Sequence, residues 1–326
     1  MNWTALRQQL LSDFALESFP PTLSLPALPD AVTQFTERAK QPNADGKELA
    51  QIIETDAGLT IELLRHVNSP VIGLRHRVGN VQQAIALLGL EKVSQFVITV
   101  GLQAAVRARK SRLIHQPSFW LGSLQRALFA REVATLLNVD KELAFSGALL
   151  QDYLLPVVTN ELYDLYFSFT ENRDYCSPCI CQFERDNLGW DHALAAGCLA
   201  AHWPLPDALV CCILLHHMGL PVLADPALGK TAAAAVVLSA LLPDQLRQHR
   251  DGLEQLHWLE TQWPAFRLAE LTSRVDKQST EFGIGVANQV SLSRRCQPTP
   301  ERETGKAGTS QRAASRREFA PVAINV

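Results

Sequence analysis

The chain has no hydrophobic segment of the kind that marks a membrane or secreted protein. No window of its 326 residues holds the roughly 18–20 uncharged apolar residues that a membrane span needs. The start, Met1-Asn2-Trp3-Thr4, shows no basic segment followed by an apolar stretch, so a secretory signal is not indicated. We therefore expect a soluble protein without a membrane span.

Glycine and tyrosine are scarce, with 17 Gly and 4 Tyr. No stretch alternates strictly between apolar and polar residues, so a β-sheet is not indicated. Leu- and Ala-rich runs with apolar residues three to four positions apart are typical of helices. A hydrophobic content of 47% with 19% charged residues fits a globular protein. The sequence therefore predicts an all-α fold.

Cysteine is present but poorly placed for disulfides. Six of the seven Cys lie between residues 176 and 212. Cys211 and Cys212 are adjacent within an apolar helical run, where burial and adjacency make both of them poor disulfide partners. We therefore expect a reducing, cytoplasmic environment.

The charge distribution gives little reason to expect nucleic-acid binding. The net charge is −3, although residues 291–317 alone hold seven Lys/Arg against two Asp/Glu. The helical region 46–68 could suggest a helix-turn-helix, but Lys47, Arg65 and His66 are offset there by four acidic residues. Phosphate contacts require a positive face, so we expect no specific DNA binding.

Two groups of short motifs carry the most information. The second half of the chain contains Glu184, Gly189-Trp190-Asp191-His192, Trp203-Pro204-Leu205-Pro206 and His216-His217. The first half contains Leu25-Pro26-Ala27-Leu28-Pro29, Thr55-Asp56, Leu63-Leu64-Arg65-His66-Val67-Asn68-Ser69-Pro70 and Ala84-Ile85-Ala86-Leu87-Leu88-Gly89. In this order and spacing the chain resembles the HDOD family (HD-related output domain). Members of that family keep the helical scaffold of metal-dependent HD phosphohydrolases without the full metal site.

The resemblance and the helical spacing together predict four segments. We expect an amphipathic helix over 1–19, an HDOD domain over 20–220, a C-terminal helical extension over 221–279 and a disordered basic tail over 280–326. Within the HDOD domain, an N-terminal helical sub-bundle (20–108) is expected to pack on an HD-like helical bundle (118–220). The longer helices are expected at 118–138, 141–155, 156–169, 188–203, 206–218, 228–242 and 252–275.

The candidate metal ligands lie mainly on two predicted helices that meet near Trp203–Pro206. His192 lies twelve residues before Pro204 and His216 twelve after it, so both imidazoles stand about 18 Å from the turn of an antiparallel hairpin. Imidazole is a good ligand for Zn, Fe or Mn. Asp152, expected on the helix 141–155, would add a carboxylate. Adjacent helical residues point about 100° apart, so only one of His216 and His217 is expected to face this site.

The rest of an HD-type metal shell is missing. The resemblance implies a histidine where Gln151 stands, before Asp152, and another near Gly122. We therefore expect no catalytic residue and no cofactor, with a single divalent ion on Asp152, His192, His216 and His217 as the alternative. In the structural alternative, His192 and His216 pair with Glu184 or Asp152 in the core. Glu184 either orients His192 or caps a helix at Asn187-Leu188.

The resemblance implies a non-catalytic bacterial protein of signal transduction, an output or scaffold domain. We expect it to bind signalling proteins or a small ligand in a groove between the two sub-bundles, near Glu184, His192, His216, His217 and Asn68. The alternative from another class is a metal-dependent phosphodiesterase or phosphohydrolase with an altered shell. A weaker alternative is a sensor of a nucleotide second messenger that does not cleave it.

Overall fold

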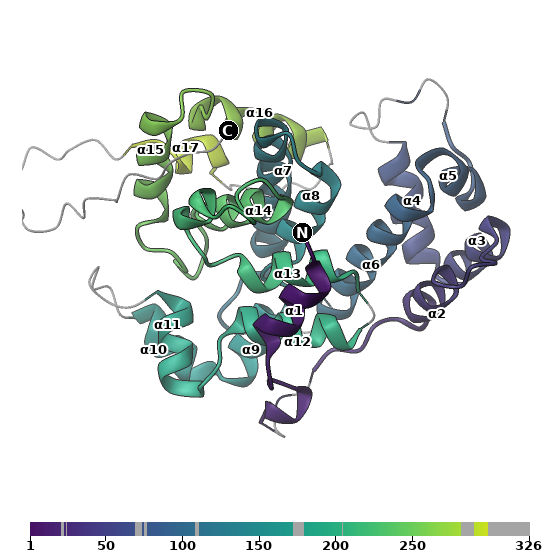
Figure 1. Ribbon diagram of the computed structural model, residues 1–326, viewed down its shortest axis with the longest axis horizontal. Helices are drawn as coiled ribbons and strands as arrows, with labels where there is room; N and C mark the ends of the chain where they lie inside the picture. Colours follow the sequence, from purple (N-terminus) through teal and green to yellow (C-terminus); the bar gives the residue numbers. More distant parts are fainter. Residues whose placement is uncertain are drawn as a thin grey trace, which may run out of the picture.

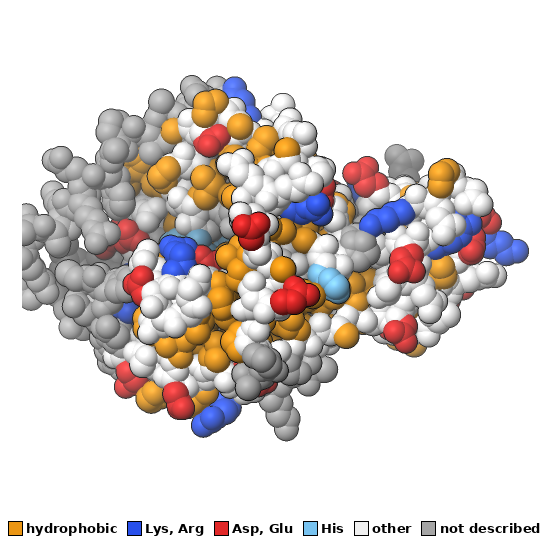
Figure 2. Space-filling model, turned by 60° about the horizontal axis from the view of Figure 1, so that its bottom comes forward, with side chains coloured by type: hydrophobic (Ala, Val, Ile, Leu, Met, Phe, Trp, Pro, Cys, Tyr) orange, Lys and Arg blue, Asp and Glu red, His pale blue; other side chains and the backbone are white. Residues whose placement is uncertain are grey.

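The computed structural model describes residues 1–20, 25–68, 77–107, 111–171, 179–203, 205–281 and 290–298, with the single residues Leu23 and Leu74. Helices joined by short turns make up these ranges, which contain no strand. This confirms the predicted all-α fold. None of the described helices is long and apolar enough to cross a membrane. On the face shown in Figure 2, acidic and basic side chains are scattered among apolar ones.

An N-terminal sub-bundle is formed by helices at one end of the molecule (Figure 1). It comprises α2 (Asp30–Ala39), α3 (Gly46–Glu54), α4 (Ala57–Val67), α5 (Val81–Leu88) and α6 (Leu90–Arg107). The side chains of Asp45, Asp56 and Asn80 accept hydrogen bonds from backbone N–H groups at the starts of α3, α4 and α5. The apolar faces of these helices close over a small core that includes Leu49 and Leu63, both 0% exposed.

The HD-like bundle is built around two long, largely buried helices. These are α7 (Gln116–Leu137) and α8 (Lys141–Leu150), which pack closely on each other. Around them lie α9 (Leu155–Glu161), α10 (Tyr163–Glu171), α11 (Ile180–Leu188), α12 (His192–His202) and α13 (Asp207–Leu215). Three later helices complete this part: α14 (Ala232–Ala240) packs on α7 and α8, α16 (Leu268–Glu281) packs on α7, and α15 (Gly252–Gln262) contacts α16.

Helix α6 connects the two parts of the molecule. It packs against α2, α4 and α5 on one side and against α8 on the other. In Figure 1 it runs from the N-terminal sub-bundle towards α7 and α8. The predicted packing of one sub-bundle on the other is thus carried mainly by this helix.

Some helices are shorter than the sequence predicted. The N-terminal helix α1 (Trp3–Leu11) ends at Ser12, whose φ of 45° cannot continue a helix, and a 3-10 turn, η1 (Leu16–Ser18), follows. The predicted helix 141–155 ends at Leu150, and residues 151–154 form a turn. The predicted helices 156–169 and 252–275 each divide in two, at Leu162 and around 263–267. The predicted helix 188–203 begins only at His192, after the cap residue Asp191.

The predicted disordered tail is wrong for residues 290–298. Here α17 (Leu292–Arg295) packs on α16, with Leu292 and Cys296 buried. The carboxylate of Asp276 accepts hydrogen bonds from the backbone N–H groups of Leu292 (2.8 Å) and Ser293 (2.9 Å). Sequence reasoning missed the buried Leu292 and Cys296 and the start of α17, because the surrounding segment is rich in basic residues. The remainder of the predicted tail, 282–289 and 299–326, lies outside the described residues.

Candidate functional site

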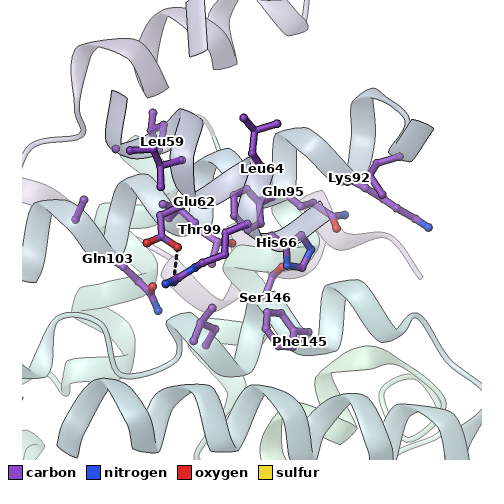
Figure 3. A pocket seen from close by; sticks show the side chains of 18 of the residues that line it. Leu59, Glu62, Leu64, His66, Lys92, Gln95, Thr99, Gln103, Phe145 and Ser146 are labelled. Atoms are coloured by element: carbon purple, nitrogen blue, oxygen red, sulfur yellow. Dashed lines mark hydrogen bonds and ion pairs between the residues drawn. The ribbon is translucent and has the colours of Figure 1, made fainter. Parts of the chain in front are cut away.

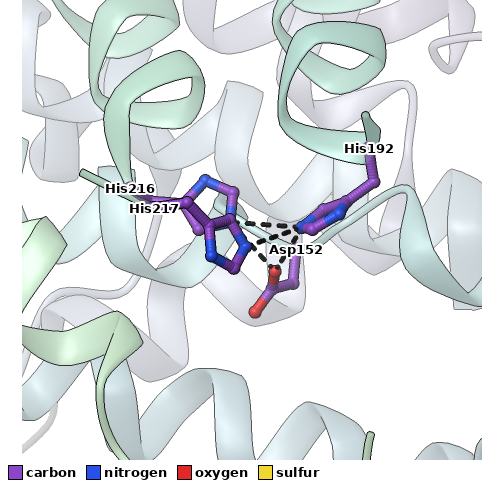
Figure 4. Close-up of side chains that lie close together, drawn as sticks. All are labelled: Asp152, His192, His216 and His217. Carbon is purple, nitrogen blue, oxygen red and sulfur yellow. Dashed lines mark hydrogen bonds and ion pairs between the residues drawn. The ribbon is translucent and has the colours of Figure 1, made fainter. Parts of the chain in front are cut away.

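Three imidazoles and one carboxylate converge inside the HD-like bundle (Figure 4). The Nε2 atom of His192 lies 3.3 Å from Nε2 of His216 and 3.0 Å from Nε2 of His217. The Oδ1 atom of Asp152 lies 3.4 Å from Nε2 of His192 and 3.2 Å from Nε2 of His216. The structure thus brings together all four residues that the sequence singled out as residual metal ligands.

Local chain geometry places each of these side chains. Asp152 lies in the turn after α8 rather than on a helix. The side chain of Asp191 caps α12 by accepting from the Leu194 N–H at 2.8 Å, which makes His192 the first helical residue. His216 and His217 follow the last residue of α13, where the chain turns, so both rings reach the site. The prediction that only one of them would face it is wrong, because it assumed that the helix continues to residue 218.

Hydrogen bonds on the far side of each ring leave Nε2 directed at the centre. His192 Nδ1 lies 2.7 Å from Glu184 Oε2, and His216 Nδ1 lies 2.6 Å from the Ile213 carbonyl oxygen. Both partners are acceptors, so both Nδ1 atoms donate, and Nε2 is the ring nitrogen left to bind a metal ion. His217 Nδ1 lies 2.7 Å from His249 Nε2, which allows the same tautomer. Such outer contacts are those that orient histidine ligands around a metal.

The two carboxylate oxygens of Asp152 differ in their hydrogen bonds. Its Oδ2 accepts from Arg126 (2.6 Å), Gln248 (3.1 Å) and Gln151 (3.3 Å). Its Oδ1 is buried and makes no well-oriented hydrogen bond with any described residue, although two histidine nitrogens are close. Burial raises the pKa of this carboxyl, but the Arg126 charge and the histidines outweigh burial and hold the pKa well below its usual range. An ionised oxygen therefore faces the three Nε2 atoms with nothing else to bind.

Glu184 orients His192 and does not cap the helix at Asn187-Leu188. Its carboxylate is fully buried and accepts from Tyr166 Oη (2.6 Å), from the His192 backbone N–H (2.9 Å) and from His192 Nδ1. Burial disfavours a charged ring, yet the Glu184 carboxylate raises the pKa of His192 well above its ordinary value. A positive charge at this position, whether a proton or a metal ion, is therefore stabilised.

The spacing of the four atoms suits a small tetrahedral ion. Metal–ligand bonds of about 2.0–2.1 Å, typical of Zn²⁺ with nitrogen and oxygen, correspond to tetrahedral edges of about 3.3–3.4 Å. Four of the six separations between the ligand atoms, 3.0, 3.2, 3.3 and 3.4 Å, lie close to that value, and all six are within 4.8 Å. Asp152, His192, His216 and His217 therefore fit an ion held entirely by protein ligands, which would contribute structural cross-linking at this point.

The two positions where an HD enzyme would have further histidines contribute no ligand here. An added Cβ on Gly122 would meet nothing within 4 Å. The Gln151 side chain is 1% exposed; it accepts from Ser239 Oγ at 3.2 Å and donates to Asp152. A small cavity of about 60 Å³ is lined by Gly122, Arg126 and Gln248, but not by any of the four candidate ligands. Arg126 and Gln248 also donate to Asp152 Oδ2, so they contact both the cavity and the cluster.

A larger pocket of about 1080 Å³ lies between the sub-bundles and is separate from the histidine cluster (Figure 3). Its walls come from α4 and α6 on one side and α7 and α8 on the other. Asn68 lines it, whereas Glu184, His192, His216 and His217 do not. The prediction that Asn68 and the histidines line one groove is therefore wrong, because the histidine cluster lies within the HD-like bundle and does not line this pocket. Asn68 also exchanges hydrogen bonds with the backbone of Val78 (2.7 and 2.9 Å), tying down the end of α4.

Comparison with known proteins decides the family. A sequence profile of the HDOD domain matches residues 25–218, well over half of the chain. The chain belongs to the HDOD domain family. An HDOD domain protein of unknown function from Geobacter sulfurreducens has a similar structure, with a TM-score of 0.57 and 18% identity over 86% of this chain and 96% of that one.

Two further solved HDOD-like structures share the fold at low identity. A candidate phosphohydrolase from Shewanella amazonensis SB2B has a TM-score of 0.60 and 18% identity, covering 87% of this chain and 99% of that chain. A candidate signal transduction protein from Marinobacter aquaeolei VT8 has a TM-score of 0.54 and 21% identity, covering 87% and 66%. An uncharacterized protein of Treponema pallidum is 23% identical over 197 residues, which are 59% of this chain and 37% of that protein. The chain thus spans little more than a third of the length of this curated relative.

Sequence reasoning missed three residues around the cluster. Arg126 and Gln248 bind Asp152, and His249 supports His217. Gln248 and His249 lie outside the family motifs, and Arg126 lies 26 positions before its partner. The one available signal was Arg126 itself, a charged residue inside the apolar run of α7, which requires a buried acidic partner.

Proposed function

We propose that this chain is a non-catalytic output protein of signal transduction that acts by binding, and that its histidine cluster holds one divalent ion in a structural role. The binding surface is the pocket between the sub-bundles. The HDOD family membership and the signal-transduction relative support the general role. The partner proteins in this proposal are other signalling components.

The closed shell around the candidate ion is the observation that carries the proposal. Structural metal sites use four protein ligands, whereas catalytic sites keep one position open for water or substrate. Here four protein ligand atoms lie within 4.8 Å of one another; Asp152, His192 and His216 are at most 2% exposed, and His217 is half-buried. A phosphodiester could therefore not reach the ion without displacing a protein ligand.

A metal-dependent phosphohydrolase is the second candidate, favoured by the name of one structural relative and by the survival of four candidate ligands. Such an enzyme activates water on its metal. In this chain the neighbouring cation, Arg126, is already bound to Asp152 and lies 3.4 Å from Asp244. It is therefore not free to bind a substrate phosphate.

The experiment combines metal analysis with a hydrolysis assay. Protein produced with Mn, Fe and Zn and purified without chelator is expected to contain close to one ion per chain, and His216→Ala is expected to lose it. An exposed histidine outside the cluster, His202, provides the matched control His202→Ala, which is expected to keep the ion.

The same metal-loaded protein is then incubated with bis(p-nitrophenyl) phosphate. We expect the same background rate from the wild-type protein and from Asp152→Ala. Turnover that Asp152→Ala abolishes would establish the phosphohydrolase instead. Folded wild-type protein without any ion would leave the binding role but overturn the structural-ion part of the proposal.

A further inference from the structure

The pocket between the sub-bundles contains polar groups that have no hydrogen-bond partner among the described residues. The Thr99 hydroxyl on α6 is on a residue only 3% exposed, and it makes no hydrogen bond with that part of the chain. Ser146 on α8 and His66 on α4 also line the pocket, and neither side chain has a hydrogen-bond partner among the described residues. A buried hydroxyl without a partner costs free energy, so these groups are suited to a ligand's donors and acceptors.

Aromatic side chains surround these polar groups. The His66 ring stacks on Phe96, with centroids 4.6 Å apart and an interplanar angle of 25°. Phe145 on α8 and Trp120 on α7 lie in the opposite wall. Figure 3 shows His66 pointing towards the helix that carries Ser146 and Phe145. Such walls accept a flat ring, because aromatic surfaces favour stacked or edge-to-face contacts with another π-system.

Charges of both signs line the pocket. Glu62 and Arg65 form an ion pair at 2.7 Å, Asp56 caps α4 by accepting from the Leu59 N–H, and Glu142 on α8 interacts with the charge of Arg131. Lys92 and Arg77 are exposed, line the pocket, and form no ion pair with any described residue. In Figure 3 Lys92 extends outward at the edge of the pocket. An anionic group at the edge near Lys92 would be attracted by its ammonium group, and the exposed Arg77 adds a second positive charge to the lining of the same pocket.

We propose that this pocket binds a planar heteroaromatic anion of the nucleotide class. The ring lies against the aromatic walls, its edge bonds to Thr99, Ser146 and His66, and its phosphate faces Lys92 and Arg77. This inference rests on the proposed binding function and names the ligand of the same pocket. The volume of about 1080 Å³ is at the upper end of ordinary ligand sites, so a mononucleotide fits with room to spare.

The protonation state of His66 agrees with this assignment. Burial, together with the Arg131 charge, lowers the pKa of His66 to about 4. The ring is therefore neutral near pH 7 and offers one donor and one acceptor, as the edge of a nucleobase requires. The adjacent hydroxyls can each donate or accept, so the pocket suits mixed donor and acceptor edges.

Calorimetric titration of the full chain with GMP and AMP tests the proposal. Guanosine tests the base without the phosphate, and ribose 5-phosphate tests the phosphate without the base. We expect at least one nucleotide to bind, and each fragment to bind at least tenfold more weakly. Binding of ribose 5-phosphate as tight as that of GMP would show a simple anion site and overturn the proposal.

Two conservative variants test the contacts. Thr99→Val removes only the hydroxyl and is expected to weaken nucleotide binding about 3- to 10-fold, the effect of one hydrogen bond. Lys92→Ala is expected to weaken binding and reduce its salt dependence. Matched controls are Thr272→Val, which removes a buried hydroxyl bonded to the Leu268 carbonyl, and Lys277→Ala, which changes an exposed residue of α16.

Absence of nucleotide binding up to about 1 mM by folded protein overturns the ligand assignment. Binding that Thr99→Val and Thr272→Val weaken equally would overturn the assignment to this pocket. Neither result changes the expected ion content or the expected outcome of the hydrolysis assay. The ligand assignment can therefore fail while the proposed non-catalytic function stands.

Discussion

At the scale of single residues, Glu184 shows how a buried charge is tolerated. It is 0% exposed, and its two oxygens receive three hydrogen bonds, from Tyr166 and from the ring and backbone of His192. Removing one donor leaves an ionised oxygen partly unsatisfied in the core. Buried hydrogen bonds to charged groups are for that reason the ones whose loss matters most.

We therefore expect Tyr166→Phe to destabilise the protein by about 1.5–3 kcal/mol. Urea unfolding followed by circular dichroism measures this change. Tyr163→Phe is the matched control, since the Tyr163 hydroxyl makes no hydrogen bond with a described residue and its ring is partly exposed. Equal midpoints for the two variants would contradict the assigned role of the Tyr166 hydroxyl.

His66 predicts a pH dependence of stability. Burial and the Arg131 charge lower its pKa to about 4 in the folded protein, against about 6.5 in an unfolded chain. The unfolded state then binds more protons below pH 6.5, so this stability is complete above pH 6.5 and is lost as the pH falls towards 4. Denaturation midpoints at pH 7 and pH 4.5 are expected to differ less in His66→Asn than in the wild type. An unchanged difference in His66→Asn would rule out this histidine as the source, and His202→Asn provides the exposed control.

At the scale of elements, the close crossing of α8 with α13 and α14 depends on one glycine. A Cβ on Gly147 would lie 2.8 Å from Cys212 Cβ and 2.9 Å from Val236 Cγ2, which are positions that neighbouring helices occupy. Gly122, in the interior of α7, has open space at the same position. The two glycines therefore offer the same substitution with opposite consequences.

Gly147→Ala is expected to destabilise the protein, because overpacking costs about 1–3 kcal/mol and exceeds the helix-propensity gain of about 0.5–1 kcal/mol. Gly122→Ala is expected to stabilise it by up to about 1 kcal/mol, since only the propensity term applies. Thermal unfolding of both variants and the wild type shows whether each substitution raises or lowers the melting temperature. A stable Gly147→Ala would mean that α8 and α13 can separate more easily than their packing implies.

The sequence predicted the main helices but not where they break. Apolar spacing located α8 and α12, because this signal is local, although the cap residue Asp191 starts α12 later than the predicted residue 188. The turn after Leu150 has no such signal. It depends on Arg126 and Gln248, which bind Asp152 across 26 and 96 positions of sequence. Asp152 and the histidines singled out from the sequence lie together in the structure, whereas their supporting partners could be identified only in the folded chain.

At the scale of the whole molecule, the two sub-bundles are joined mainly by one helix. Their buried apolar residues belong to one hydrophobic cluster, and the helix contacts between them run chiefly through α6, which packs on α8. The histidine cluster cross-links the turn after α8, the start of α12 and the end of α13, all within the HD-like bundle. An ion at this point would therefore stabilise one sub-bundle directly and the other only through α6.

This arrangement predicts a localised response to removal of the ion. Ligands that bind the native state raise the free energy of opening for the elements that they connect. Hydrogen exchange followed by mass spectrometry, with and without a chelator, is expected to show faster exchange in α8, α12 and α13 and unchanged exchange in α3 and α5. His216→Ala with chelator should show no further change. Equal acceleration in both sub-bundles would mean that they open as one cooperative unit, and ion binding could then influence the nucleotide pocket that lies between them.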